Sequence, residues 1–194
     1  MSKSYLKIPI PDCLERLSVW LLLRYRIRHY GCAFRKIELT QGKFAIVDPE
    51  DYEKLNAHKW YAARSVNDNF YAVRMLGREN GKRKFISMHR QIMQPLPGFV
   101  VDHKYGEGLD NRKENLRIAT PAQNNYNCRK TSKKTGSKYK GVCYDKQRNK
   151  YRADIKCNGH RKFLGHFDSE IDAAKAYDEA AKRLHGEFAS LNFP

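Results

Sequence analysis

The chain has 194 residues, of which 41% are hydrophobic and 12% aromatic, a composition typical of folded protein rather than of a disordered chain. Its formal net charge of +17 exceeds what solubility requires and points to a polyanionic partner, either nucleic acid or an anionic membrane. The most apolar run, residues 17–23, is far shorter than the roughly 20 residues that a spanning helix needs, so nucleic acid is favoured and no membrane partner is expected.

The N-terminus and the cysteines indicate the cellular compartment. The apolar run is too short for a secretory signal and is followed by arginines. The five cysteines are odd in number and form no Cys-x-x-Cys pair, so neither a disulfide framework nor a thiolate zinc site is indicated. We therefore expect an intracellular protein with reduced thiols, in the cytoplasm, a nucleoid or the cytoplasm of a host cell.

Residues 1–35 contain one expected helix, at about 14–30, in which leucines and a tryptophan alternate with arginines before Gly31. We expect this helix to pack its apolar side on the next domain, with a basic face touching DNA as the alternative. The segment is assigned as a basic helical extension.

Short elements follow from residue 36. The turn signal Thr40-Gln41-Gly42 separates two strand-like runs and predicts a hairpin. Asp48-Pro49-Glu50-Asp51 offers a capping acceptor, a proline at the first helical position and a carboxylate three residues on, which predicts a helix to about residue 57. The other elements expected here are strands at 60–64, 70–76 and 84–88 and a helix at 89–93.

Residues 100–127 carry the candidate chemistry. They read as a strand, a polar loop, a strand at 116–119 and a helix that begins at the capping signal Thr120-Pro121-Ala122-Gln123. Asp102 and His103 end the first strand, and Asn124 lies in the first turn of the helix, where it can face them. Carboxylate and amide oxygens suit Mg²⁺ or Mn²⁺, and a histidine titrates near neutrality, so a metal site beside a general base is indicated.

This segment closely resembles the HNH endonucleases, in particular the phage and intron-encoded homing enzymes. Their ββα-metal motif reads Asp-His, Glu-Asn-Leu and Gln-Asn, which here are Asp102-His103, Glu114-Asn115-Leu116 and Gln123-Asn124. Residues 36–60 are similar to the N-terminal part of phage HNH proteins, so the resemblance spans 36–127. It implies that His103 is the general base, that Asp102 and Asn124 hold one Mg²⁺ or Mn²⁺ ion per active site, and that Asn115 pins the loop and orients His103.

Basic residues around the motif are candidates for DNA contact. Met88-His89-Arg90 resembles a helix of the same family, in which His89 is interpreted as structural and Arg90 as a phosphate contact; Arg117 is a further DNA-binding candidate. Residues 128–137, CRKTSKKTGS, have four basic residues, no acid and no large hydrophobe, which predicts a linker. Arg129 and Lys130 are expected along DNA phosphates, with a merely solvated linker as the alternative.

The C-terminal segment predicts strands at 138–144, 151–157 and 162–167, with a tight turn at Asn158-Gly159, and then a helix that starts at Ser169. Residues 138–167 contain nine basic and two acidic residues, whereas 168–187 contain three and six. The expected sheet therefore presents a basic outer face, shared by Arg152, Asp154 and Lys156. The helical stripe expected to cover the other face is Ile171, Ala174, Tyr177, Ala181 and Leu184.

Residues 138–194 look like the APETALA2/ethylene-response-factor DNA-binding domain, through YKGVCYD, KYRADIK, FLGHFDSEIDAAKAYDEAA and LNFP. Carried over by position, Lys140, Asp154, Lys156 and Arg161 match sheet residues that this family uses on DNA. Cys143 stands where the family usually has an arginine, so its base specificity is not inherited.

Together these features predict an α+β protein: a ββα-metal HNH nuclease domain at 36–127, a linker at 128–137, and a three-stranded antiparallel sheet packed on one helix at 138–194. The expected function is a homing-type, metal-dependent endonuclease that nicks one strand of double-stranded DNA per protomer. A non-catalytic DNA-binding transcriptional regulator is the alternative, and an RNA-binding structural protein is a weaker one because no RNA stacking platform is present. The oligomeric state is left open, a monomer included.

Overall fold

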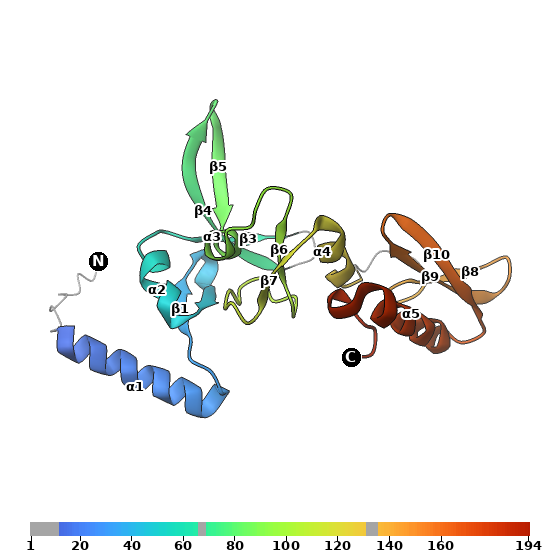
Figure 1. Cartoon of the computed structure of the whole chain (residues 1–194), viewed down its shortest axis with the longest axis horizontal. Coiled ribbons are helices and arrows are strands. Elements are labelled where there is room, and N and C mark those ends of the chain that lie inside the picture. Colours follow the sequence, from blue (N-terminus) through green and yellow to red (C-terminus); the bar gives the residue numbers. More distant parts are fainter. Residues whose placement is uncertain (1–11, 66–68, 131–135) are drawn as a thin grey trace, which may run out of the picture.

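The computed structural model describes residues 12–65, 69–130 and 136–194 (Figure 1). Within these ranges the chain forms helices and four antiparallel sheets, two of two strands and two of three. The α+β class expected from the sequence is confirmed. No helix in the described ranges has the length and apolar character needed to cross a bilayer.

The first helix, α1 (Asp12–Tyr30), lies apart from the sheets in Figure 1. None of its residues is buried, and Leu17, Trp20 and Leu21 are each at least half exposed. The prediction that this helix packs on the next domain is therefore wrong. The physical reason is that its apolar side chains are distributed around the helix among arginines and form no single stripe.

The next elements share one core. They are β1 (Arg35–Glu38), the 3-10 turn η1 (Thr40–Gly42), β2 (Phe44–Val47), α2 (Pro49–Asn56), β3 (Tyr61–Arg64), β4 (Phe70–Glu79), β5 (Lys82–Ser87) and α3 (Met88–Met93). Trp60 is buried with Val47 and Met88, and its indole N–H donates to the Leu55 carbonyl at 2.8 Å. The predicted hairpin, helix and three strands are confirmed, and the outer part of β4 and β5 projects from the body as a long hairpin (Figure 1).

The motif residues lie on a hairpin followed by a helix. β6 (Val100–His103) pairs antiparallel with β7 (Leu116–Ala119), and α4 (Pro121–Asn127) follows. The predicted capping box is complete: the Thr120 hydroxyl accepts from the Gln123 backbone at 3.2 Å, and the Thr120 backbone N–H donates to the Gln123 side chain at 2.8 Å. This cap fixes where α4 begins and therefore how it faces the end of β6.

The C-terminal sheet has the order β10-β9-β8, from β8 (Val142–Asp145), β9 (Lys150–Cys157) and β10 (His160–Phe167). α5 (Glu170–His185) packs its alanines and Tyr177 on Ala153 and Ile155, and the 3-10 turn η2 (Gly186–Phe188) follows. The three strands and the helix are confirmed. Ile171 is an exception to the predicted stripe, because it is 47% exposed while Ala173 and Ala180 are buried in its place.

The first strand of this sheet starts later than predicted. Residues 138–141 form a loop, and β8 begins only at Val142. The cause is Gly141, which has φ +75, and a Cβ built there would lie 1.9 Å from the Tyr177 ring. The chain turns closely over the helix at this glycine before it can enter the sheet.

Candidate active site

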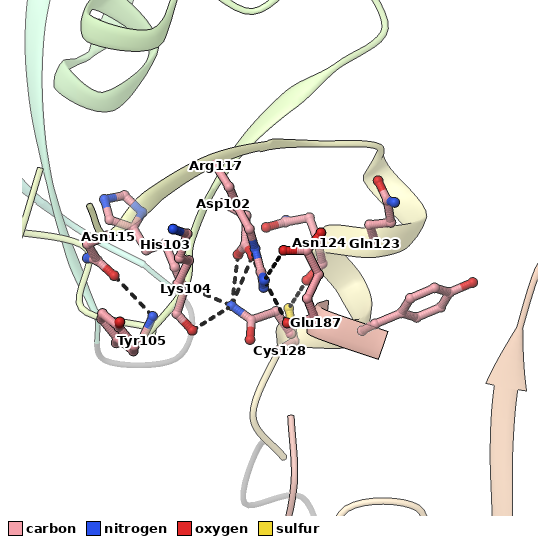
Figure 2. Close-up of polar contacts among 12 residues, drawn as sticks. Asp102, His103, Lys104, Tyr105, Asn115, Arg117, Gln123, Asn124, Cys128 and Glu187 are labelled. Carbon is pink, nitrogen blue, oxygen red and sulfur yellow. Dashed lines mark hydrogen bonds and ion pairs between the residues drawn. The ribbon is translucent and has the colours of Figure 1, made fainter. Parts of the chain in front are cut away.

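The end of β6 opens on a cleft of about 730 Å³ that lies between β4, α3, the loop after β6 and α4. Asp102, His103 and Asn124 all line this cleft, as do His89 and Arg129. Three residues separated by up to 22 positions in the chain are thus brought to one surface. Figure 2 shows their surroundings.

The Asp102 carboxylate is almost fully buried and is held from two sides. Arg117, its partner across the β6–β7 ladder, donates from Nε and Nη2 to Asp102 Oδ2, with the nitrogens at 2.8 and 2.7 Å. The amide of Asn127 lies 3.0 and 3.1 Å from the two carboxylate oxygens. Oδ2 accepts from both residues, whereas Oδ1 accepts from Asn127 alone among the described residues, so Oδ1 keeps capacity for a further partner.

His103 is also buried, and its Nε2 lies 3.3 Å from Oδ1 of Asn111. Since an amide oxygen only accepts, this contact requires a proton on Nε2 and leaves Nδ1 as the basic nitrogen. Burial lowers the pKa of His103, and the Asn111 hydrogen bond and the Asp102 carboxylate oppose this only in part. The ring is therefore neutral near pH 7, which is the form that can accept a proton.

Asn111 was not found by sequence reasoning, although its side chain forms the hydrogen bond to the His103 ring. It is fully buried, its backbone N–H donates to the Ile46 carbonyl at 2.7 Å, and Ile46 also donates to the Leu109 carbonyl. This bridge ties the active-site loop to β2. No local pattern marks the residue, because only the path of the loop brings it beneath His103.

Asn115 lies on the other side of the same loop and is fully buried. Its side-chain oxygen accepts from the Tyr105 backbone at 3.1 Å, and its amide donates to the Asp110 carbonyl at 2.8 Å. The contact with Tyr105, drawn in Figure 2, joins the start of the loop to its end, and the contact with Asp110 holds its middle. The orienting contact on His103 comes from Asn111, so any effect of Asn115 on that ring passes through the backbone.

His89 joins the site from α3. Its ring centroid lies 4.9 Å from that of His103 at an interplanar angle of 80°, and Tyr71 lies edge-on to it at 5.7 Å. The Ser87 hydroxyl lies 3.0 Å from Nε2. Burial, followed by the nearby His103 and Arg90, lowers the pKa of His89 to about 3, so the ring is a neutral wall of the cleft.

The helix α4 contributes two amides to the site. Asn124 lines the cleft, and Asn127, one turn later on the same helical face, donates to Asp102 and to the His103 backbone carbonyl at 2.9 Å. Asn127 was missed by sequence reasoning, although its spacing of three from Asn124 was a usable signal.

The donor set can be compared with what a divalent cation requires. Within the described ranges no group of three or more His, Cys, Asp and Glu side chains is placed to hold a metal. One carboxylate and one amide oxygen at an open cleft nevertheless fit Mg²⁺, which keeps several waters and takes other ligands from a bound phosphate. Asp102 and Asn124 therefore fit an ion shared with substrate rather than one enclosed by protein.

The predicted DNA contacts near the cleft fall into two groups. Arg90 is exposed, and Arg129 borders the cleft while donating to the Tyr105 carbonyl at 3.1 Å. Arg117 and Lys130 are engaged within the protein instead: Lys130 donates to the backbone carbonyls of Ser137, Tyr139 and Val142, and burial lowers its pKa. Of the predicted linker, residues 131–135 lie outside the described ranges.

The outer face of the C-terminal sheet carries most of the remaining candidates. Arg152 pairs with Asp154 at 2.9 Å, and Lys156 lies directly opposite Arg161 in the β9–β10 register. Like charges in such a pair repel each other unless an anion lies between them. Lys140 differs, because it lies outside the strands, donates to the Tyr126 carbonyl and has a pKa lowered to about 8 by burial.

Two parts of this chain are similar to known proteins. The AP2 domain family model matches residues 137–187. An uncharacterised HNH endonuclease of Acanthamoeba polyphaga mimivirus is 32% identical over 158 residues, which cover 78% of this chain and 76% of that protein. Protein 3.8 of Escherichia phage T7 is 32% identical over 108 residues, 55% of this chain and 88% of its own length. Dehydration-responsive element-binding protein 2C of Arabidopsis thaliana is 45% identical over 58 residues, 29% of this chain and 17% of its length.

These matches define a nuclease-type protein with an added DNA-binding module. The chain belongs to the HNH endonuclease family and carries a C-terminal AP2 domain. Both resemblances found in the sequence are thereby confirmed.

Proposed function

We propose that the chain is a metal-dependent DNA endonuclease that hydrolyses a phosphodiester bond in the cleft beside Asp102 and His103. The observation that carries this proposal is the hydrogen bond from His103 Nε2 to Asn111, which leaves Nδ1 basic at a cleft also lined by Asp102 and Asn124. The antiparallel pair β6–β7 followed by α4 supports this assignment, because a ββα-metal site needs two strands followed by a helix.

In the proposed mechanism His103 accepts a proton at Nδ1 from a water molecule, while Nε2–H stays bonded to Asn111 and fixes the ring. Asp102 and Asn124 would hold the divalent cation, which supplies stabilisation of negative charge on the phosphate and on the leaving 3′ oxygen. Arg129 at the cleft edge meets a phosphate of the bound strand. The products carry 5′ phosphates.

One candidate active site within the described residues supports the cutting of one strand per protomer, as in a homing-type nicking enzyme. The basic outer face of the AP2 sheet, with Arg152, Asp154, Lys156 and Arg161, would bind double-stranded DNA and select where the nuclease acts. We assign the nuclease domain to residues 36–127, the linker to 128–137 and the DNA-binding domain to 138–194. Such an enzyme works inside the cell, where its DNA lies.

One observation favours the alternative, a DNA-binding regulator that does not cut. The Asp102 carboxylate already has Arg117 and Asn127 as partners, and a fully occupied carboxylate does not need a cation. Oδ1, however, accepts only from Asn127 among the described residues and the residue lines an open cleft, so the carboxylate can still bind a cation, which favours the enzyme.

A nicking assay on supercoiled plasmid with Mg²⁺ or Mn²⁺ separates the two functions. A positioned general base contributes about 10²–10⁴ in rate, so His103→Ala should lose nicking by that factor and keep its DNA affinity. The matched control is His58→Ala, since His58 is exposed and lies outside the cleft. Equal nicking by both variants, or none by the wild type on a plasmid that it binds, would contradict the proposal.

A further inference from the structure

We propose that Arg117 is a positioning residue through which the AP2 domain sets the orientation of the active-site carboxylate Asp102. The inference rests on the proposed function, and it replaces the expectation that Arg117 touches DNA. It makes the C-terminal domain a structural part of the nuclease site.

The first observation is that every nitrogen of the Arg117 guanidinium has a hydrogen-bond partner within the protein. Nε and Nη2 hold Asp102, and Nη1 donates to the backbone carbonyl of Glu187 at 2.6 Å. All three nitrogens thus have partners, and the side chain is only 11% exposed. A guanidinium in this state offers little to a phosphate, which argues against a DNA contact.

The second observation is that the far partner belongs to the AP2 domain. Glu187 and Phe188 form η2 directly after α5, and the guanidinium lies over the Phe188 ring at 3.9 Å from its centroid. Figure 2 shows Arg117 between Asp102 and Glu187. Because the guanidinium is a rigid planar fork, a shift of η2 must turn the edge that holds Asp102.

The third observation is that the AP2 domain also contacts α4, the helix that carries Asn124 and Asn127. The Tyr126 ring stacks on His185 with centroids 3.9 Å apart and planes within 4°, and the Tyr126 hydroxyl accepts from the Asn158 backbone at 2.9 Å. The AP2 domain therefore contacts both the arginine that holds the carboxylate and the helix that brings the amides.

The geometry assigns different roles to the two oxygens of Asp102: Oδ2 binds Arg117, and Oδ1 is the oxygen that would bind the cation. Arg117 holds Oδ2 and fixes the plane of the carboxylate, so that Oδ1, which accepts only from Asn127 among the described residues, also keeps one orientation. Residues that orient a metal ligand are typically worth about 10–100-fold in metal affinity or activity. A looser carboxylate should lower cation affinity and turnover together and leave DNA binding unchanged.

The test compares the full-length wild type with Arg117→Lys, which keeps the charge but loses the fork, and with Phe188→Leu, which keeps apolar volume but loses the ring face. The control is Glu187→Gln, which keeps the backbone carbonyl that accepts from Arg117 and removes only the charge of a 74% exposed side chain that lies 3.7 Å from Arg117 Nη1, an exposed ion pair that contributes little. Three quantities are measured: Mn²⁺ affinity without DNA, kcat, and DNA affinity without metal as a function of salt.

We expect Arg117→Lys and Phe188→Leu to weaken Mn²⁺ binding and kcat about tenfold. Their salt slope for DNA binding should equal that of the wild type, and Glu187→Gln should behave as the wild type throughout. A salt slope reduced by about one in Arg117→Lys would show a lost phosphate contact and overturn the proposal. Wild-type Mn²⁺ affinity in Phe188→Leu would also overturn it, and this readout stands even if the protein never nicks DNA.

Discussion

Replacement of Asn111 by alanine tests whether the buried amide prepares His103 as a base. The variant removes the acceptor that lies 3.3 Å from His103 Nε2 and keeps the imidazole itself. A buried neutral hydrogen bond is worth about 1 kcal/mol net, which corresponds to about a fivefold loss of kcat if all of it is expressed in the transition state. The loss should be far smaller than that of His103→Ala.

Two measurements check this expectation on the full-length protein. Nicking rates at saturating DNA give kcat, and ¹⁵N NMR of the metal-free protein reports which His103 nitrogen carries the proton. In the wild type the proton should be on Nε2, and in Asn111→Ala this preference should weaken. Asn125→Ala is the matched control, because Asn125 is exposed on α4 and outside the cleft. A wild-type proton on Nδ1, or unchanged kcat in Asn111→Ala, would refute the reasoning.

Further predictions concern the AP2 face, a glycine and the half-buried His89. Arg161→Ala should weaken DNA binding, lower the salt slope by about one in an anisotropy titration and leave kcat unchanged. Gly141→Ala should destabilise the protein by roughly 1–3 kcal/mol in thermal unfolding, because its Cβ would strike the Tyr177 ring; Gly159→Ala, also at positive φ but in open space, measures the backbone cost alone. The pKa of His89 is about 3 in the folded protein and about 6.5 in the unfolded chain. Because the unfolded chain binds the proton more readily, the free energy of unfolding that His89 contributes is complete above pH 6.5 and is lost as the pH falls toward 3. His89→Gln should therefore show a shallower loss of stability over that interval in urea unfolding.

Several features could be predicted because they depend on residues close in sequence. The Thr120–Gln123 capping box and the Asn158-Gly159 turn are local, and both occur as expected, with positive φ at each turn residue. Strand alternation also placed Arg152, Asp154 and Lys156 on the face of β9 opposite the buried Ala153 and Ile155.

Other features could not be predicted because distant segments decide them. The apolar residues of α1 suggested burial, yet burial needs a stripe and a partner surface. The strand expected from residue 138 starts late because Gly141 must pass close to Tyr177, a contact that no local pattern reveals.

The sequence by itself determined the family and the candidate residues Asp102, His103 and Asn124, since motif spacing along a strand, loop and helix fixes them. Only the tertiary structure decided their partners. Asn111 reaches His103 because the loop is tied to β2, and Arg117 reaches Glu187 across 70 residues because the AP2 domain docks on the hairpin and α4. Those contacts depend on how separate units pack, which a one-dimensional pattern does not encode.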